Sequence, residues 1–175
     1  HPTLDVVIRT VDLSVRKNVY QFYSDLKDFQ LETWVNNAGF GNYDSVAQQD
    51  LGKIDTMLRL NVEALTILSS LFVRDYKDVP GTQLINISSA GGYTIVPTAV
   101  TYCATKFYVS TFTEGVAWEL IESGAKMRAK VLAPAATQTE FGKKANNVDT
   151  YDYDKAFGTY HTSQQMAEFL LKLYD

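Results

Sequence analysis

Four polar residues, Asn61, Ser89, Tyr102 and Lys106, follow one another along the chain at spacings that suit proton transfer. Lys106 comes four residues after Tyr102, and on a helix that spacing places both side chains on one face. Ser89 lies thirteen residues before Tyr102, at the end of segment 83–89, which reads as a buried strand. A tyrosine beside a lysine and a serine can hand a proton to a carbonyl oxygen, so the pattern predicts a carbonyl or alcohol oxidoreductase.

The Tyr-x-x-x-Lys spacing by itself is weak evidence, because the chain holds 11 tyrosines and the spacing also occurs at positions 23/27 and 151/155. Only Tyr102 has a serine thirteen residues earlier, at a strand end. The other two pairs are interpreted as residues of solvated faces.

The predicted chemistry depends on the ionisation of Tyr102. A free tyrosine has a pKa of about 10, and a nearby ammonium favours the phenolate. We therefore expect Lys106 to lower the pKa of Tyr102, which would act as general acid in reduction and general base in oxidation. Ser89 would donate a hydrogen bond to the substrate oxygen and stabilise its developing charge.

The bulk composition excludes several classes of function. The chain of 175 residues fits one domain, and with a net charge of −4 and no basic stripe it is not expected to bind nucleic acid. No run looks apolar and long enough to span a bilayer, so no membrane partner is expected. The single cysteine suits a reducing, cytoplasmic compartment, and no metal-ligand spacing is present.

Strand-like and helix-like segments alternate, which predicts an α/β fold with parallel strands and helices on both faces. The expected strands are 4–11, 32–36, 83–88 and 126–133. The expected helices are 15–26 with Ser14 as N-cap, 50–77 with Asp50 as N-cap, a third carrying Tyr102 and ending at Gly124, and a last one capped by Ser163. Segment 141–160 is expected to be a mobile polar connection.

In this order the residues resemble the short-chain dehydrogenase/reductase family. The resemblance covers nearly the whole chain and rests on six motifs: Asp12-Leu13, Asn36-Asn37-Ala38-Gly39, Asn61-Val62, Ile87-Ser88-Ser89, Tyr102 with Lys106, and Pro134-Ala135-Ala136-Thr137-Gln138-Thr139.

The resemblance implies a single Rossmann-type domain over 1–175, a doubly wound parallel sheet in a three-layer α/β/α arrangement, and an NAD or NADP cofactor. The cofactor residues that it implies are Asp12, Leu13, Asn36, Ala38, Gly39, Tyr102, Lys106, Pro134, Thr137 and Thr139. It also implies that Asn61 holds a water that relays protons to Lys106; the other interpretation of Asn61 is a kinked helix with a local hydrogen bond.

The chain departs from the family pattern in two ways. Ala135 and Thr137 replace the usual Gly and Val, which is tolerable where the contact comes from the backbone. The family's opening strand and Gly-rich diphosphate turn have no counterpart here, and neither does its last strand. The family's sheet has the strand order 3-2-1-4-5-6-7, and the segment of residues 4–11 resembles its third strand. Without the family's first two strands, this segment would have no neighbour to pair with. We expect a domain incomplete at both ends, part of a chain of roughly 250 residues.

Two other functions stay open: a non-catalytic cofactor-sensing or interaction protein on the same fold, and an epimerase or dehydratase relative. The family's pocket-forming loops supply Tyr93, Ile95, Val96 and Phe141 here, which favours an apolar or aromatic-lined substrate site. The resemblance further implies a homodimer or homotetramer built on helices 50–77 and 102–123.

Overall fold

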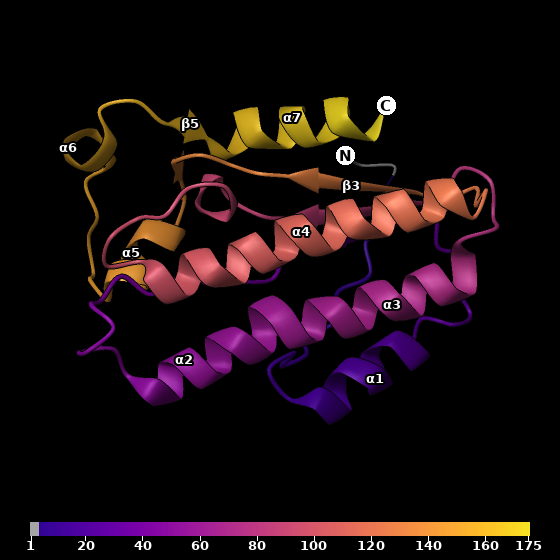
Figure 1. Ribbon diagram of the computed structural model, residues 1–175, viewed down its shortest axis with the longest axis horizontal. Coiled ribbons are helices and arrows are strands. Elements are labelled where there is room, and N and C mark those ends of the chain that lie inside the picture. Colours follow the sequence, from indigo (N-terminus) through magenta and orange to yellow (C-terminus); the bar gives the residue numbers. More distant parts are fainter. Residues whose placement is uncertain (1–3) are drawn as a thin grey trace.

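The computed structural model describes residues 4–175, and at its centre lies a parallel sheet of three strands in the order β1-β2-β3 (Figure 1). The strands are β1 (Thr33–Asn36), β2 (Gln83–Ile87) and β3 (Arg128–Leu132), with Trp34 opposite Leu84 and Leu84 opposite Ala129. These are three of the four predicted strands, and their parallel pairing confirms the predicted fold class.

The helices follow the predicted alternation. They are α1 (Arg16–Ser24), α2 (Leu51–Leu58), the π-helical segment η1 (Arg59–Ala64), α3 (Leu65–Tyr76), the short 3-10 segment η2 (Ala90–Gly92), α4 (Val100–Glu122), α5 (Phe141–Asn146), α6 (Tyr153–Phe157) and α7 (Ser163–Tyr174). Two further short strands, β4 (Thr137–Gln138) and β5 (His161–Thr162), pair in parallel beside α7. In Figure 1, α1, α2–α3 and α4 lie side by side.

Side-chain alternation decides which helices cover which face of the sheet. Leu84 points into the main core, where it packs with Trp34 of β1, Phe72 of α3 and Leu120 of α4. Gln83 and Lys130 belong to the opposite face, and both donate hydrogen bonds to carbonyl oxygens at the end of α7. The helices therefore cover both faces, as the α/β prediction requires.

A buried polar network ties β1 and β2 to α3 and α4. The Asn36 amide donates to Asn86 Oδ1 (2.8 Å) and to Ser69 Oγ (3.0 Å), and it accepts from the Trp34 indole (2.8 Å). Asn86 in turn donates to Thr113 Oγ1 (2.9 Å). Because every member is buried, each lost hydrogen bond would leave a desolvated polar group behind.

The prediction of a strand over 4–11 was wrong. Residues 4–12 form no strand, and Leu4, Val6 and Ile8 are 67%, 71% and 83% exposed. A strand needs a paired neighbour, and among residues 4–175 no strand lies beside this segment.

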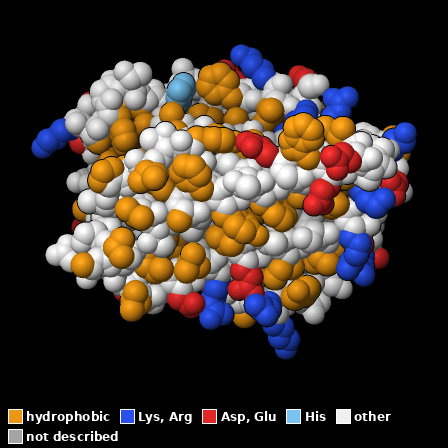
Figure 2. Space-filling model, in the orientation of Figure 1, with side chains coloured by type: hydrophobic (Ala, Val, Ile, Leu, Met, Phe, Trp, Pro, Cys, Tyr) orange, Lys and Arg blue, Asp and Glu red, His pale blue; other side chains and the backbone are white. Residues whose placement is uncertain are grey.

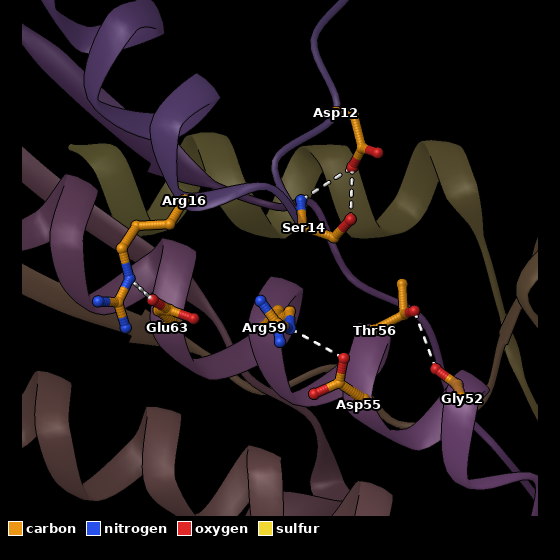
Figure 3. A network of polar contacts seen from close by, with 8 residues as sticks. All are labelled: Asp12, Ser14, Arg16, Gly52, Asp55, Thr56, Arg59 and Glu63. Carbon is orange, nitrogen blue, oxygen red and sulfur yellow. Dashed lines mark hydrogen bonds and ion pairs between the residues drawn. The ribbon is translucent and has the colours of Figure 1, made fainter.

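Two predicted helix caps were also wrong. The N-cap of α1 is Val15, and Ser14 instead donates its N–H (2.9 Å) and its hydroxyl (2.6 Å) to Asp12 Oδ1 (Figure 3). The N-cap of α7 is Thr162, which forms a capping box with Gln165. The Asp50 cap of α2 is confirmed.

The long helix that starts at Leu51 continues through η1 to Tyr76, in agreement with the predicted helix 50–77. By length and composition alone it could cross a membrane, so the expectation that no segment reaches those limits was wrong. The evidence for a membrane span is weak, because core helices pass the same test and the buried Met57, Leu68 and Phe72 of this helix pack inside the domain.

Segment 141–160, expected to be a mobile connection, contains the two helices α5 and α6. Tyr153 holds α5 in place, because its hydroxyl accepts from Gly142 N (3.0 Å) and donates to Thr139 O (3.1 Å). The rings of Tyr151, Phe157 and Tyr160 surround Tyr153 at 5.0–5.8 Å. The polar composition hid this local aromatic cluster.

We predict that Asn86→Ala lowers the free energy of unfolding by about 3 kcal/mol, because it removes one buried hydrogen-bond partner each from the Asn36 amide and the Thr113 hydroxyl and leaves a cavity between β2 and α4. Urea titration measures the change, and Ser70→Ala, at an exposed position next to Ser69, is the control. A loss no larger than that of Ser70→Ala would contradict the role given to the network.

Candidate active site

The four predicted catalytic residues meet at the carboxyl ends of the strands, where ligands bind in open α/β sheets. Ser89 follows β2, Tyr102 and Lys106 lie on α4, and Asn61 lies in η1. The elements η1 and η2 both contact α4. Residues far apart in the sequence are thus brought to one end of the sheet.

Ser89 and Tyr102 both lie close to Gly91. A Cβ at position 91 would be 3.5 Å from Ser89 Oγ, 3.6 Å from Tyr102 Cε1 and 3.3 Å from Cys103 Sγ. The Ser89 side chain caps η2 by accepting a hydrogen bond from Gly91 N (3.1 Å). A short Gly-rich turn therefore aims the serine hydroxyl at the tyrosine.

The Tyr102 side chain is 6% exposed, and its burial raises its pKa to about 12. The hydroxyl of Ser89 opposes this shift, since a hydrogen bond to the phenolate lowers the pKa. The net shift is upward, so the expectation that Lys106 brings the pKa of Tyr102 below its ordinary value is not met. Lys106 Nζ lies 6.0 Å from the centre of the tyrosine ring, and burial outweighs any effect of its charge.

Lys106 is buried between α4 and β2. Its ammonium donates to the carbonyl oxygen of Ile87 (2.8 Å), and burial lowers its pKa to about 8. Its own carbonyl accepts from the Ser88 hydroxyl (3.0 Å), which also pairs with Ser110 Oγ (2.7 Å). The backbone N–H of Ser88 donates to Leu132 O (2.7 Å). Its side chain also anchors α4.

Asn61 is 1% exposed, and its side-chain amide binds the backbone of Phe40 in both directions. Nδ2 donates to Phe40 O (2.9 Å) and to Thr105 Oγ1 (3.2 Å), while Oδ1 accepts from Phe40 N (3.2 Å). Both amide protons are therefore engaged within the protein. These partners are not the local hydrogen bond of a kinked helix, because they lie 21 and 44 residues away along the chain, and the water relay stays a prediction.

Gly39 lies beside two of these residues. A Cβ at this position would be 3.0 Å from Asn61 Oδ1 and 3.8 Å from Lys106 Nζ. A side chain here would crowd the site, so glycine leaves the space next to the lysine open.

The other predicted cofactor residues lie around β1. The Asn36 side chain belongs to the buried network, whereas Ala38 is exposed beyond the strand end. Leu13 and Ala38 line a cavity of about 200 Å³ together with Val35, Leu60 and Leu65.

Asp12 lies next to Leu13. One oxygen of its carboxylate accepts from Ser14, which lowers its pKa. Figure 3 also shows the ion pairs Arg16–Glu63 and Arg59–Asp55, which are carried by α1 and the long helix.

The predicted segment 134–139 lies beside the loop that carries Ser89. The carbonyl oxygen of Pro134 accepts from Ala90 N (2.7 Å). Thr137 begins β4, and the Thr139 hydroxyl accepts from Phe141 N (3.1 Å) at the start of α5. All three residues thus follow β3 at the same end of the sheet as Tyr102.

Sequence reasoning missed Tyr43, which lies in a loop after β1. Its ring contacts Tyr102 edge to face with centroids 6.2 Å apart, and it contacts Phe141 at 6.4 Å. Phe141 itself lies 5.4 Å from Tyr102. No local pattern marks Tyr43, because the contact joins three separate segments.

Within residues 4–175 no three His, Cys, Asp or Glu side chains cluster as metal ligands would.

The matches of this chain to a family model and to known proteins agree with one another. A family model described as short chain dehydrogenase matches residues 3–149. The protein named dehydrogenase/reductase SDR family member 11 from Homo sapiens is 30% identical over 155 residues, which cover 85% of this chain and 58% of the relative. The protein of the same name from Gallus gallus is 29% identical, covering 86% and 60%. The chain therefore spans less than two thirds of the length of these relatives.

Solved structures show the same fold. A short-chain dehydrogenase from Sphingobium yanoikuyae in complex with NADPH has a TM-score of 0.81 at 24% identity, covering 93% of this chain and 61% of that one. A closed form of serine dehydrogenase complexed with NADP+ has a TM-score of 0.83 at 20% identity, covering 94% and 68%. Together with the family-model match over most of its length, this shows that the chain belongs to the short-chain dehydrogenase family.

Proposed function

We propose that this chain carries the catalytic centre of an NAD(P)-dependent oxidoreductase that interconverts a carbonyl compound and a secondary alcohol. The observation that supports it most is the convergence of Ser89, Tyr102 and Lys106 at the carboxyl end of β2. Family membership and the NADPH- and NADP+-bound structures of similar proteins support the same proposal.

Side chains of the protein carry out the proton-transfer steps. In reduction the Tyr102 hydroxyl gives its proton to the carbonyl oxygen, while Ser89 donates a hydrogen bond to that oxygen. In oxidation Tyr102 takes the proton of the alcohol. A bound nicotinamide supplies or accepts the hydride.

The residues present fit the adenosine end of such a cofactor. The cavity of about 200 Å³ beside Leu13 and Ala38 has largely apolar walls, which suits a flat heterocycle. Asp12 precedes Leu13 in the chain; its Oδ1 accepts hydrogen bonds from Ser14, and its Oδ2 makes no hydrogen bond within residues 4–175. We propose that Asp12 Oδ2 faces the base, that Asn36 orders the strand end, and that Pro134, Thr137 and Thr139 hold the nicotinamide end.

Lys106 is proposed to change partner when the cofactor binds. Its ammonium donates a hydrogen bond to Ile87 O, and the pKa of Tyr102 is raised above its ordinary value. Because Gly39 has no side chain beside its ammonium, Lys106 would be able to hold the ribose of a bound cofactor. The tyrosine would then gain the neighbouring positive charge that lowers its pKa.

We also propose a homodimer or homotetramer. The outer face of α4 exposes Trp118 (68%) and Ile121 (75%), and a groove of about 460 Å³ runs between α3 and α4. Figure 2 shows apolar side chains spread across the face that these helices present. Exposed large apolar residues of this kind are typical of interfaces.

Tyr102→Phe is the direct test of the proposed function. It keeps the buried ring and removes the only proton that the tyrosine can donate. We expect turnover in the intact protein to fall at least roughly a hundredfold with cofactor affinity unchanged. Carbonyl compounds with NADPH and NADH supply the assay. Unchanged turnover would refute the mechanism, and no turnover of any carbonyl by the unmodified protein would favour the non-catalytic or epimerase alternatives.

The burial of Lys106 predicts a pH dependence of stability without cofactor. The unfolded lysine keeps its proton up to pH 10.5, while the folded one loses it near pH 8. The unfolded state therefore binds more protons between these values, and this residue's contribution to stability rises with pH, by up to about 3 kcal/mol. Above pH 10, the contribution of Tyr102 to stability falls as the pH rises, because its pKa in the folded state is about 12.

We expect the unfolding free energy of the unmodified protein to rise relative to that of Lys106→Met from pH 8 to pH 10. Lys126→Met, at an exposed position, is the control and should show no such change. A flat difference for Lys106→Met would mean that the ammonium is not desolvated as the structure indicates.

Trp118→Asp tests the assembly. A charge on the outer face of α4 should convert the oligomer to monomer, as measured by light scattering at micromolar concentration. Tyr20→Asp places the same charge at an exposed aromatic position of α1 and should leave the mass unchanged. A monomeric unmodified protein would refute the proposal.

A further inference from the structure

Two hydrogen bonds that run in opposite directions join Lys106 of α4 to the end of β2. The Lys106 ammonium donates to the carbonyl oxygen of Ile87 (2.8 Å). In return, the hydroxyl of the next residue, Ser88, donates to the carbonyl oxygen of Lys106 (3.0 Å). Because Ser88 and Lys106 are both buried, water has little access to either bond. The helix and the strand end therefore hold each other by two side chains.

A second serine of α4 fixes the direction of the Ser88 hydroxyl. A serine hydroxyl has one proton to donate and can accept at its oxygen. Since the proton of Ser88 goes to Lys106 O, the hydroxyl of Ser110 is the donor in the 2.7 Å contact between Ser110 Oγ and Ser88 Oγ. Ser110 is buried as well. The two hydroxyls thus form a chain that ends on the backbone of the candidate catalytic lysine.

Gly92 packs against this chain of hydroxyls from η2. A Cβ at position 92 would lie 2.4 Å from Ser88 Oγ and 2.6 Å from Lys106 O and from Ser110 Oγ. These distances are shorter than Cβ atoms approach other atoms in proteins. Any side chain at position 92 would therefore disrupt the bond between Ser88 and Lys106.

The strand end that carries Ser88 is itself held by the segment of β3. The N–H of Ser88 donates to Leu132 O (2.7 Å). Two residues later, the N–H of Ala90 donates to Pro134 O (2.7 Å). The backbone is fixed in this way on both sides of the candidate catalytic serine. Against this strand end, the Ser88 hydroxyl sets the position of α4 at Lys106.

The two bonds between Lys106 and β2 differ in whether they persist when a cofactor binds. Under the proposed function, Lys106 gives up Ile87 O as a partner and its ammonium holds the cofactor ribose. The bond from Ser88 goes to the backbone of Lys106, so a movement of the lysine side chain does not break it. Ser88 is therefore able to keep this turn of α4 on the strand end while the ammonium changes its partner.

We propose that Ser88 is a positioning residue for cofactor binding, whose hydroxyl holds the backbone of Lys106 on β2 while the lysine side chain leaves Ile87. Without this hydroxyl, release of Ile87 by the ammonium would also release the helical turn, so cofactor binding would cost more free energy. This inference rests on the proposed function, because it takes Lys106 as a residue that binds the cofactor.

A double-mutant cycle in cofactor affinity tests this role without turnover. The intact protein is titrated with NADPH and with NADH, and binding is followed by fluorescence. We expect Ser88→Ala to raise the Kd roughly tenfold when Lys106 is present. In a Lys106→Met background it should leave the Kd unchanged, because no ammonium has to leave Ile87. An equal rise in both backgrounds is what a merely structural role would give, and it would overturn the proposal, as would no binding of either cofactor.

Ser110→Ala is the matched control. It removes a buried hydroxyl from the same chain and leaves the bond from Ser88 to Lys106 O in place. Its Kd should stay near that of the unmodified protein. Ser88→Ala should fold, since Lys106 O lies inside α4 and keeps its helical hydrogen bond. A Kd raised as much by Ser110→Ala as by Ser88→Ala would overturn the proposal.

Amide hydrogen exchange without added cofactor tests whether the two bonds replace each other. Ser88→Ala and Lys106→Met should each leave the amides of residues 102–110 protected, because one bond still holds the turn. In the double variant their exchange should be roughly tenfold faster than the two single variants together predict. Purely additive effects would overturn the proposal.

Failure of this inference is distinguishable from failure of the proposed function. A wrong assignment of Tyr102 as proton donor would show as unchanged turnover of Tyr102→Phe and would leave the binding cycle as expected. A wrong role for Ser88 would show in the binding cycle and leave the loss of turnover in Tyr102→Phe as expected.

Discussion

The site depends on the close contact between α4 and the end of β2. The Ser88 hydroxyl donates to Lys106 O, the Lys106 ammonium donates to Ile87 O, and the backbone of Gly92 fits between them. A Cβ at position 92 would lie 2.4 Å from Ser88 Oγ and 2.6 Å from Lys106 O, so only a glycine permits this approach. This contact holds the helix that carries Tyr102 against the strand that ends at Ser89.

Burial of the site also disfavours charge on its two ionisable groups, Tyr102 and Lys106. It raises the pKa of Tyr102 to about 12 and lowers that of Lys106 to about 8. A neutral tyrosine suits proton donation, whereas proton abstraction from an alcohol needs stabilising charge next to the phenolate. Burial therefore favours the neutral tyrosine, the form that can donate a proton.

The π-helical segment η1 links the long helix to the same site. One residue too many for regular α-helical hydrogen bonding widens the turn around Asn61, and such segments often occur at functional sites. The Asn61 amide there replaces backbone partners for Phe40, at the point where the chain leaves β1. The loop that continues to Gly41 and Tyr43 is therefore positioned by a helix residue from the middle of the core.

The sequence by itself determined the local features: three strands, the long helices, the Asp50 cap, and the placement of Ser89, Tyr102 and Lys106. These depend on short periodicities and on spacings within single elements, which a chain carries in its own order. The strand over 4–11 failed because pairing needs a neighbour, and the Ser14 cap failed because Asp12 accepts from Ser14 instead. Only the tertiary structure decided the ionisation of Tyr102 and Lys106 and the aromatic triangle of Tyr43, Tyr102 and Phe141, because burial and contacts between distant segments follow from packing.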